Sequence, residues 1–146
     1  MTAVSLAAAA LTISGCGGSP KPLTRAELTA KADAICRTVI AKLKTKTKTI
    51  NSQQDIARIA PELSALEQTA LAELGKLVPP AELESDWKQF VAGAQTLADD
   101  TAKLGEYAKM KNLKAAKGLI DASVAVQHQM TATAKRDGLK DCEQVA

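Results

Sequence analysis

Apolar residues recur at helical spacing along most of this chain. The clearest stretch runs from Leu83 to Ala108, where the positions of one face follow one another in alternating steps of four and three residues. Such steps place one apolar stripe along a helix, whereas a half-buried strand would alternate with period two. Weaker stripes of the same kind follow three other segments. We therefore predict four helices, beginning near residues 24, 51, 80 and 112.

Residues typical of helix ends surround these stripes. Thr24 followed by Glu27 forms a capping box for the first helix, with Leu23 as its hydrophobic staple. Asn51 or Ser52 is a suitable cap for the second helix, and Gly138 can end the fourth in the left-handed conformation.

Prolines lie in and around the second and third helices. Pro61 is expected to kink or split the second helix near Ala60, and Val78-Pro79-Pro80 to end it. Pro80 then suits the first position of the third helix.

Composition agrees with an all-α fold. Hydrophobic residues make up 46% of the chain, yet there is one Trp, one Tyr and one Phe, so the core must be aliphatic and alanine-rich. Trp87 and Phe90 are expected to anchor one end of it. Long helices joined by short turns favour a left-handed four-helix bundle with up-down-up-down topology, here over residues 24–146.

The N-terminal residues have the pattern of an export signal. Ala3–Ile13 is an uncharged, mostly apolar stretch of 11 residues, too short to span a bilayer and typical of a signal-peptide core. It continues into Ile13-Ser14-Gly15-Cys16, the lipobox pattern of bacterial lipoproteins. No charge precedes Lys21, so we expect the true start to lie upstream of Met1. The alternative is that Cys16 is an ordinary thiol in an apolar arm.

The lipobox predicts both processing and location. Residues 1–15 would be a signal peptide, Cys16 would carry the acyl groups, palmitate among them, and residues 16–23 would form a flexible tether rich in Gly, Ser and Pro. The domain would then be attached to the cell membrane on its extracytoplasmic face.

Two further cysteines remain once Cys16 is lipidated. Cys36 and Cys142 form an even pair in an exported protein, which favours a disulfide. In an up-down-up-down bundle the C-terminal residues must fold back along the first helix to reach Cys36. The alternative is two unpaired thiols, with Cys36 as a small core residue.

Two short motifs resemble those of a group of uncharacterised actinobacterial secreted proteins and lipoproteins. They are Ala32-Asp33-Ala34-Ile35-Cys36 and Gly138-Leu139-Lys140-Asp141-Cys142, and the alanine-rich composition is similar too. The resemblance implies an extracytoplasmic helical domain with paired cysteines, and no activity.

Candidate chemistry is sparse. His128 is the single histidine, and Asp121 precedes it by seven residues, so both can share a helix face, but no nucleophile elbow accompanies them. We predict no catalytic residues, no cofactor and no metal site: Ala125 stands where a Glu-x-x-His motif needs Glu, and clustered Cys and His are absent. The glutamates, Glu67 among them, are expected on solvated helix faces.

The charge pattern limits the partners. The net charge is +3, and neither a concentrated basic face nor stacking aromatic residues indicate a nucleic acid. Alternating Lys and Thr over residues 42–49 is interpreted as a solvated helix end, with a basic strand or a contact to anionic lipid as alternatives.

These observations favour a non-enzymatic lipoprotein that binds a partner protein or the cell envelope. The alternative function is a carrier of a small apolar or lipid ligand between the helices, which would require a cavity.

Overall fold

The computed structural model describes residues 21–144. Within this range the chain is all-helical: four long helices and two short 3-10 helices are present and no strand. The elements are α1 (Arg25–Thr47), α2 (Gln53–Leu74), η1 (Ala81–Leu83), α3 (Glu84–Lys109), α4 (Leu113–Asp137) and η2 (Cys142–Gln144). The prediction of an all-α domain with four helices is confirmed.

Short polar side chains fix where the helices begin. The Thr24 side chain accepts a hydrogen bond from the Glu27 backbone, and the Glu27 carboxylate accepts one from the Thr24 backbone, which completes the predicted capping box. Ser52, one of the two predicted caps, accepts a hydrogen bond from Asp55 N at the start of α2. At the other end of the chain, Gly138 has a φ of 80° and ends α4 in the left-handed conformation.

Pro61 does not split α2, and this part of the prediction is wrong. The helix is continuous from Gln53 to Leu74, through the proline. Pro61 removes one backbone hydrogen bond, but Ile59, Ala60 and Leu63 on either side are buried. Their packing offsets the loss.

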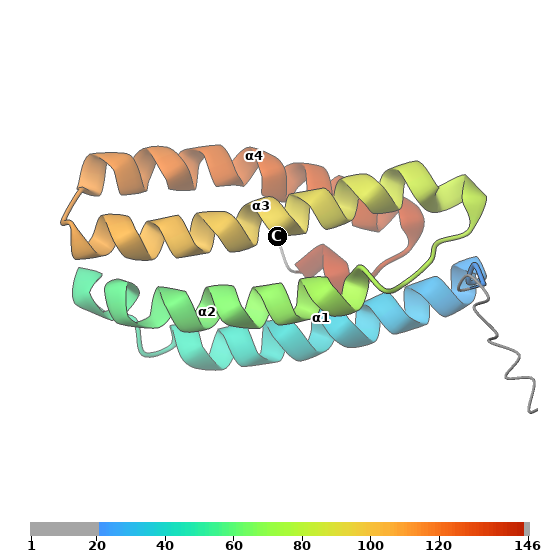
Figure 1. Ribbon diagram of the computed structural model, residues 1–146, viewed down its shortest axis with the longest axis horizontal. Helices are drawn as coiled ribbons and strands as arrows, with labels where there is room; N and C mark the ends of the chain where they lie inside the picture. Colours follow the sequence, from blue (N-terminus) through green and yellow to red (C-terminus); the bar gives the residue numbers. More distant parts are fainter. Residues whose placement is uncertain (1–20, 145–146) are drawn as a thin grey trace, which may run out of the picture.

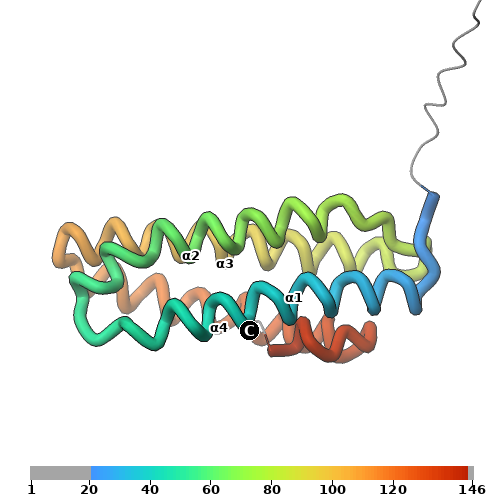
Figure 2. The backbone as a smooth tube through the Cα atoms, turned by 90° about the horizontal axis from the view of Figure 1, so that it is seen from below, coloured from blue at the N-terminus to red at the C-terminus, as the bar shows by residue number. Residues whose placement is uncertain are grey.

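The helices lie along one long axis, each beside the next one in sequence (Figures 1 and 2). The described chain enters at one end, which we call the tether end, where α1 begins and α4 finishes. The α1–α2 and α3–α4 turns both lie at the opposite end, which we call the distal end. There Gln53 Nε2 donates a hydrogen bond to the Ala108 carbonyl at 3.1 Å and so links the two turns.

The largest apolar side chains gather in the tether-end half. Trp87 and Phe90 are buried with their rings stacked at 5.8 Å, as anchors of the core. Around them pack residues of all four helices and the C-terminal segment, among them Leu28, Leu74, Met130 and Leu139.

Small residues instead bring α2 and α3 together toward the distal end. A Cβ atom on Gly105 would lie only 2.7 Å from the Ala60 Cβ, so a glycine is needed at this crossing. Ser64, which is buried, donates a hydrogen bond to the Ala98 carbonyl at 3.0 Å. These small residues let α2 and α3 approach each other closely.

The C-terminal segment folds back and closes the tether-end half. After Gly138, η2 lies against both α1 and α4, and Cys142 forms a disulfide with Cys36 across a Cα–Cα distance of 5.1 Å. Asp33 Oδ1 accepts a hydrogen bond from Asp141 N at 2.9 Å, and Asp141 pairs with Arg37 at 2.8 Å. The predicted pairing of Cys36 and Cys142 is confirmed, including the return of the C-terminal residues along α1.

Candidate functional site

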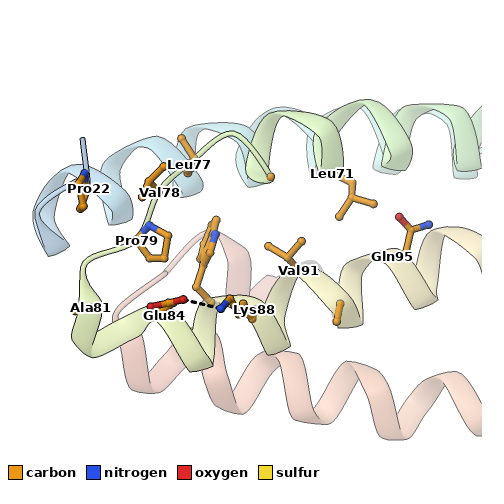
Figure 3. Close-up of a pocket in the computed structure, with 13 residues that line it drawn as sticks. Pro22, Leu71, Leu77, Val78, Pro79, Ala81, Glu84, Lys88, Val91 and Gln95 are labelled. Carbon is orange, nitrogen blue, oxygen red and sulfur yellow. Dashed lines mark hydrogen bonds and ion pairs between the residues drawn. The ribbon is translucent and has the colours of Figure 1, made fainter. Parts of the chain in front are cut away.

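An apolar pocket of about 730 Å³ opens at the tether end, between α2, the α2–α3 linker and α3 (Figure 3). Its walls come from the end of α2, from residues 77–79 of the linker and from the first turns of α3. The lining residues are Pro22, Leu71, Gly75, Leu77, Val78, Pro79, Ala81, Glu84, Trp87, Lys88, Val91, Ala92 and Gln95.

The α2–α3 linker forms one wall of this pocket. Pro79 and Pro80 cannot continue α2, and Pro80 is extended, with φ −65° and ψ 154°. The backbone of Leu23 donates a hydrogen bond to the Val78 carbonyl at 2.9 Å, which fixes the residues before α1 against the linker. The side chains of Leu71 and Val91 face the space between α2 and α3 (Figure 3).

The polar groups of this pocket lie at its edge. Glu84 and Lys88 form an ion pair with side chains 55% and 72% exposed, and the pKa of Glu84 is lowered by the hydrogen bond from Lys88. Gln95 lies further along α3 (Figure 3). An apolar interior with a few polar groups at the rim is typical of sites for small apolar or amphipathic ligands, and the volume is within their usual range of roughly 300–1,000 Å³.

A second, smaller cavity of about 200 Å³ lies between α2, α3 and α4. Glu67 of α2 lines it together with Asp100 and Ser123, and Ser123 Oγ donates a hydrogen bond to Asp100 at 2.8 Å. The Oε2 atom of Glu67 is buried and has no hydrogen-bond partner among the described residues. Burial therefore raises the pKa of Glu67 to about 7, although the Thr101 hydroxyl acts in the opposite direction.

The expectation that Glu67 lies on a solvated face is wrong. Glu67 follows Leu63 by four residues and precedes Leu74 by seven, so it lies on the same face of α2 as these two buried residues and is itself half-buried. No pattern in the sequence could have predicted the apolar pocket, because its walls come from four separate stretches of the chain.

The other predicted site residues remain apart. Cys16 lies outside the described residues. His128 is exposed on α4, and Asp121 pairs with Lys117 at 2.6 Å. Within residues 21–144, no three side chains of His, Cys, Asp or Glu are grouped so that they could hold a metal ion. No described helix is both long enough and apolar enough to cross a membrane.

Comparison with known proteins gives no match to a family model, a curated protein or a solved structure.

Proposed function

We propose that this protein is a non-enzymatic, lipid-anchored binding protein of the extracytoplasmic membrane face, and that its tether-end pocket holds an apolar ligand such as an acyl chain. The pocket carries this proposal. Of the two functions that the sequence suggests, ligand binding needs a cavity, and the apolar pocket beside Trp87 and Val91 offers one.

The position of the pocket supports the same function. Pro22 is part of its lining and lies six positions after Cys16 in the sequence. Six residues reach at most about 20 Å, so an anchor at Cys16 would keep the pocket close to the membrane surface. A pocket so close to the membrane surface can exchange an apolar ligand with the bilayer without exposing the ligand to bulk water.

Binding can be measured through the single tryptophan of the chain. Trp87 lines the pocket, so a brominated fatty acid that enters it will quench the indole fluorescence. We expect saturable quenching of the wild-type protein. Ala92→Phe places a ring in the pocket and should weaken binding by at least about tenfold, the effect of roughly 1.4 kcal/mol.

Ala102→Phe is the matched control, because Ala102 is also an exposed alanine of α3 and does not line the pocket. Equal affinities of the two variants would contradict the proposal, as would the absence of saturable quenching in the wild type.

The anchor has its own test. The intact mass of protein extracted from its native membranes should correspond to a chain that begins at Cys16 and carries acyl groups. An unprocessed chain would refute the membrane-anchored part of the proposal, and ligand binding in the pocket would still be tested by fluorescence quenching.

For the architecture we propose the left-handed up-down-up-down arrangement, which the short turns and sequential helix contacts support.

A docking role toward a partner protein or the cell envelope is a second candidate. Large apolar side chains are exposed on the α3–α4 hairpin at Met110, Leu113, Ile120 and Val124. Such residues are common at interaction surfaces.

A further inference from the structure

The charges of this chain are divided between its two ends. Residues 40–62 and 102–121, which form the distal half of the bundle, carry ten basic and four acidic side chains. The remainder of the chain carries nine basic and twelve acidic side chains. The modest net charge of +3 therefore conceals a strongly basic distal half.

Two lysine-rich turns meet at the distal end. One is the end of α1 with the following turn, and the other is the α3–α4 turn (Figure 1). The hydrogen bond from Gln53 to the Ala108 carbonyl holds the turns together, and a shallow hollow beside it is lined by residues of both, including Ser52 and Lys111. The fold thus joins two basic segments that are about 60 residues apart in sequence.

Half of these basic side chains have no acidic partner within the described part of the chain. The distal carboxylates are used locally: Glu62 pairs with Lys46, Glu106 with Lys109 and Asp121 with Lys117. Five lysines form no ion pair with a described residue, and they are Lys42, Lys44, Lys48, Lys111 and Lys114. Unpaired cations at this density attract an anionic surface.

The same end also exposes apolar side chains at its tip. Met110 is 63% exposed and Leu113 is 67% exposed, and both stand between lysines. Lys111, between them, has a φ of 55°, so the chain makes a tight reversal here that projects the two side chains. Apolar residues flanked by lysines are typical of segments that enter the boundary between lipid headgroups and acyl chains.

We propose that the distal end binds the surface of a bilayer that contains anionic phospholipid. The lysines of both turns face the headgroup phosphates, and Met110 and Leu113 enter the boundary below them. A soluble polyanion would use the lysines but would leave Met110 and Leu113 in water. The lipid surface uses both features, and this assignment requires neither the anchor at Cys16 nor a ligand in the tether-end pocket.

The test is vesicle co-sedimentation of residues 21–146. This piece contains every helix, the core and the disulfide described above, and it lacks the apolar N-terminal stretch that would bind any vesicle. Its fold is checked first by its helical circular dichroism and by the absence of free thiols. Vesicles of phosphatidylcholine alone are compared with vesicles of equal parts phosphatidylcholine and phosphatidylglycerol.

Two charge-reversal variants distinguish binding by the distal lysines from binding that depends only on the net charge of the protein. Lys48→Glu with Lys114→Glu changes one lysine in each turn and should weaken binding by about 30-fold or more. Lys31→Glu with Lys140→Glu makes the same change in net charge at exposed positions of the tether-end half and should leave binding within about threefold. A loss that is equal in both variants would overturn the assignment, as would binding independent of phosphatidylglycerol.

A third variant tests the lipid itself. Met110→Ser with Leu113→Ser keeps every charge, and we expect it to weaken vesicle binding by at least about tenfold. Unchanged vesicle binding by this variant, together with equally tight binding of the wild type to soluble polyphosphate, would show an anionic polymer site and refute the lipid surface.

Discussion

We predict that replacing Glu67 will change the pH dependence of stability, because its half-buried carboxylate on α2 opposes folding when it is ionised. In Glu67→Gln an amide of similar shape replaces it and stays neutral at every pH. The unfolded chain ionises near pH 4.5, while the folded chain holds the proton until about pH 7. The folded protein therefore has its full share of stability from this group below pH 4.5 and loses it as the pH rises to 7.

The size of the effect follows from that difference. One pKa unit corresponds to about 1.4 kcal/mol, so the difference between a pKa of 4.5 in the unfolded chain and about 7 in the folded chain sets an upper bound of about 3.5 kcal/mol. Glu67 is only partly buried, and solvent screening reduces the expected effect to about 1–2 kcal/mol. At pH 8 the Gln variant should be more stable than the wild type by this amount, and at pH 4 the two should be nearly equal.

Urea unfolding at both pH values measures the difference. The pKa of Asp137 is also raised by burial, but this group is present in both proteins and cancels from the comparison. Glu73→Gln is the control, since Glu73 is an exposed glutamate of the same helix. A stability difference between wild type and Glu67→Gln that is the same at pH 4 and pH 8 would refute the reasoning.

The remaining predictions concern packing and the cross-link. Reduction of the Cys36–Cys142 disulfide, or Ser at both positions, should lower stability by about 4–5 kcal/mol through the entropy of a loop that spans 106 positions. Denaturation with and without reductant measures this, and an unchanged midpoint would contradict it. Gly105→Ala should destabilise by about 1–3 kcal/mol because the new Cβ meets Ala60, whereas Gly118→Ala meets nothing within 4 Å and should stabilise by about 0.5–1 kcal/mol. A melting temperature that rises in both glycine variants would show that helix propensity, and not the α2–α3 contact, determines the effect at Gly105.

Local sequence was sufficient for the four helices and for three of their ends, but it placed the end of α2 and the start of α3 several residues from Leu74 and Glu84, where the structure has them. The Thr24 capping box, the Ser52 cap and Gly138 act over three or four residues, so their signals are complete in the sequence. Trp87 and Phe90 were also predicted correctly as core anchors, because the apolar stripe of α3 identifies the buried face. Pro61 shows the limit of such rules, since burial of its neighbours outweighed its preference against helix.

The cysteines are an intermediate case. Their number favoured a disulfide, but a bond between Cys36 and Cys142 also required the residues after Gly138 to return along α1. The fold supplies that return through the hydrogen bonds from residues 141 and 142 to Asp33.

The sequence by itself determined that this is a four-helix, alanine-rich domain with two cysteines available for pairing. Only the tertiary structure decided where binding is possible. The pocket beside Trp87 forms where the end of α2, the linker and the start of α3 meet, and the distal basic surface exists because two distant turns meet at one end. Helix formation depends on neighbours within a few residues, whereas a cavity or a charged surface depends on segments that only packing brings together.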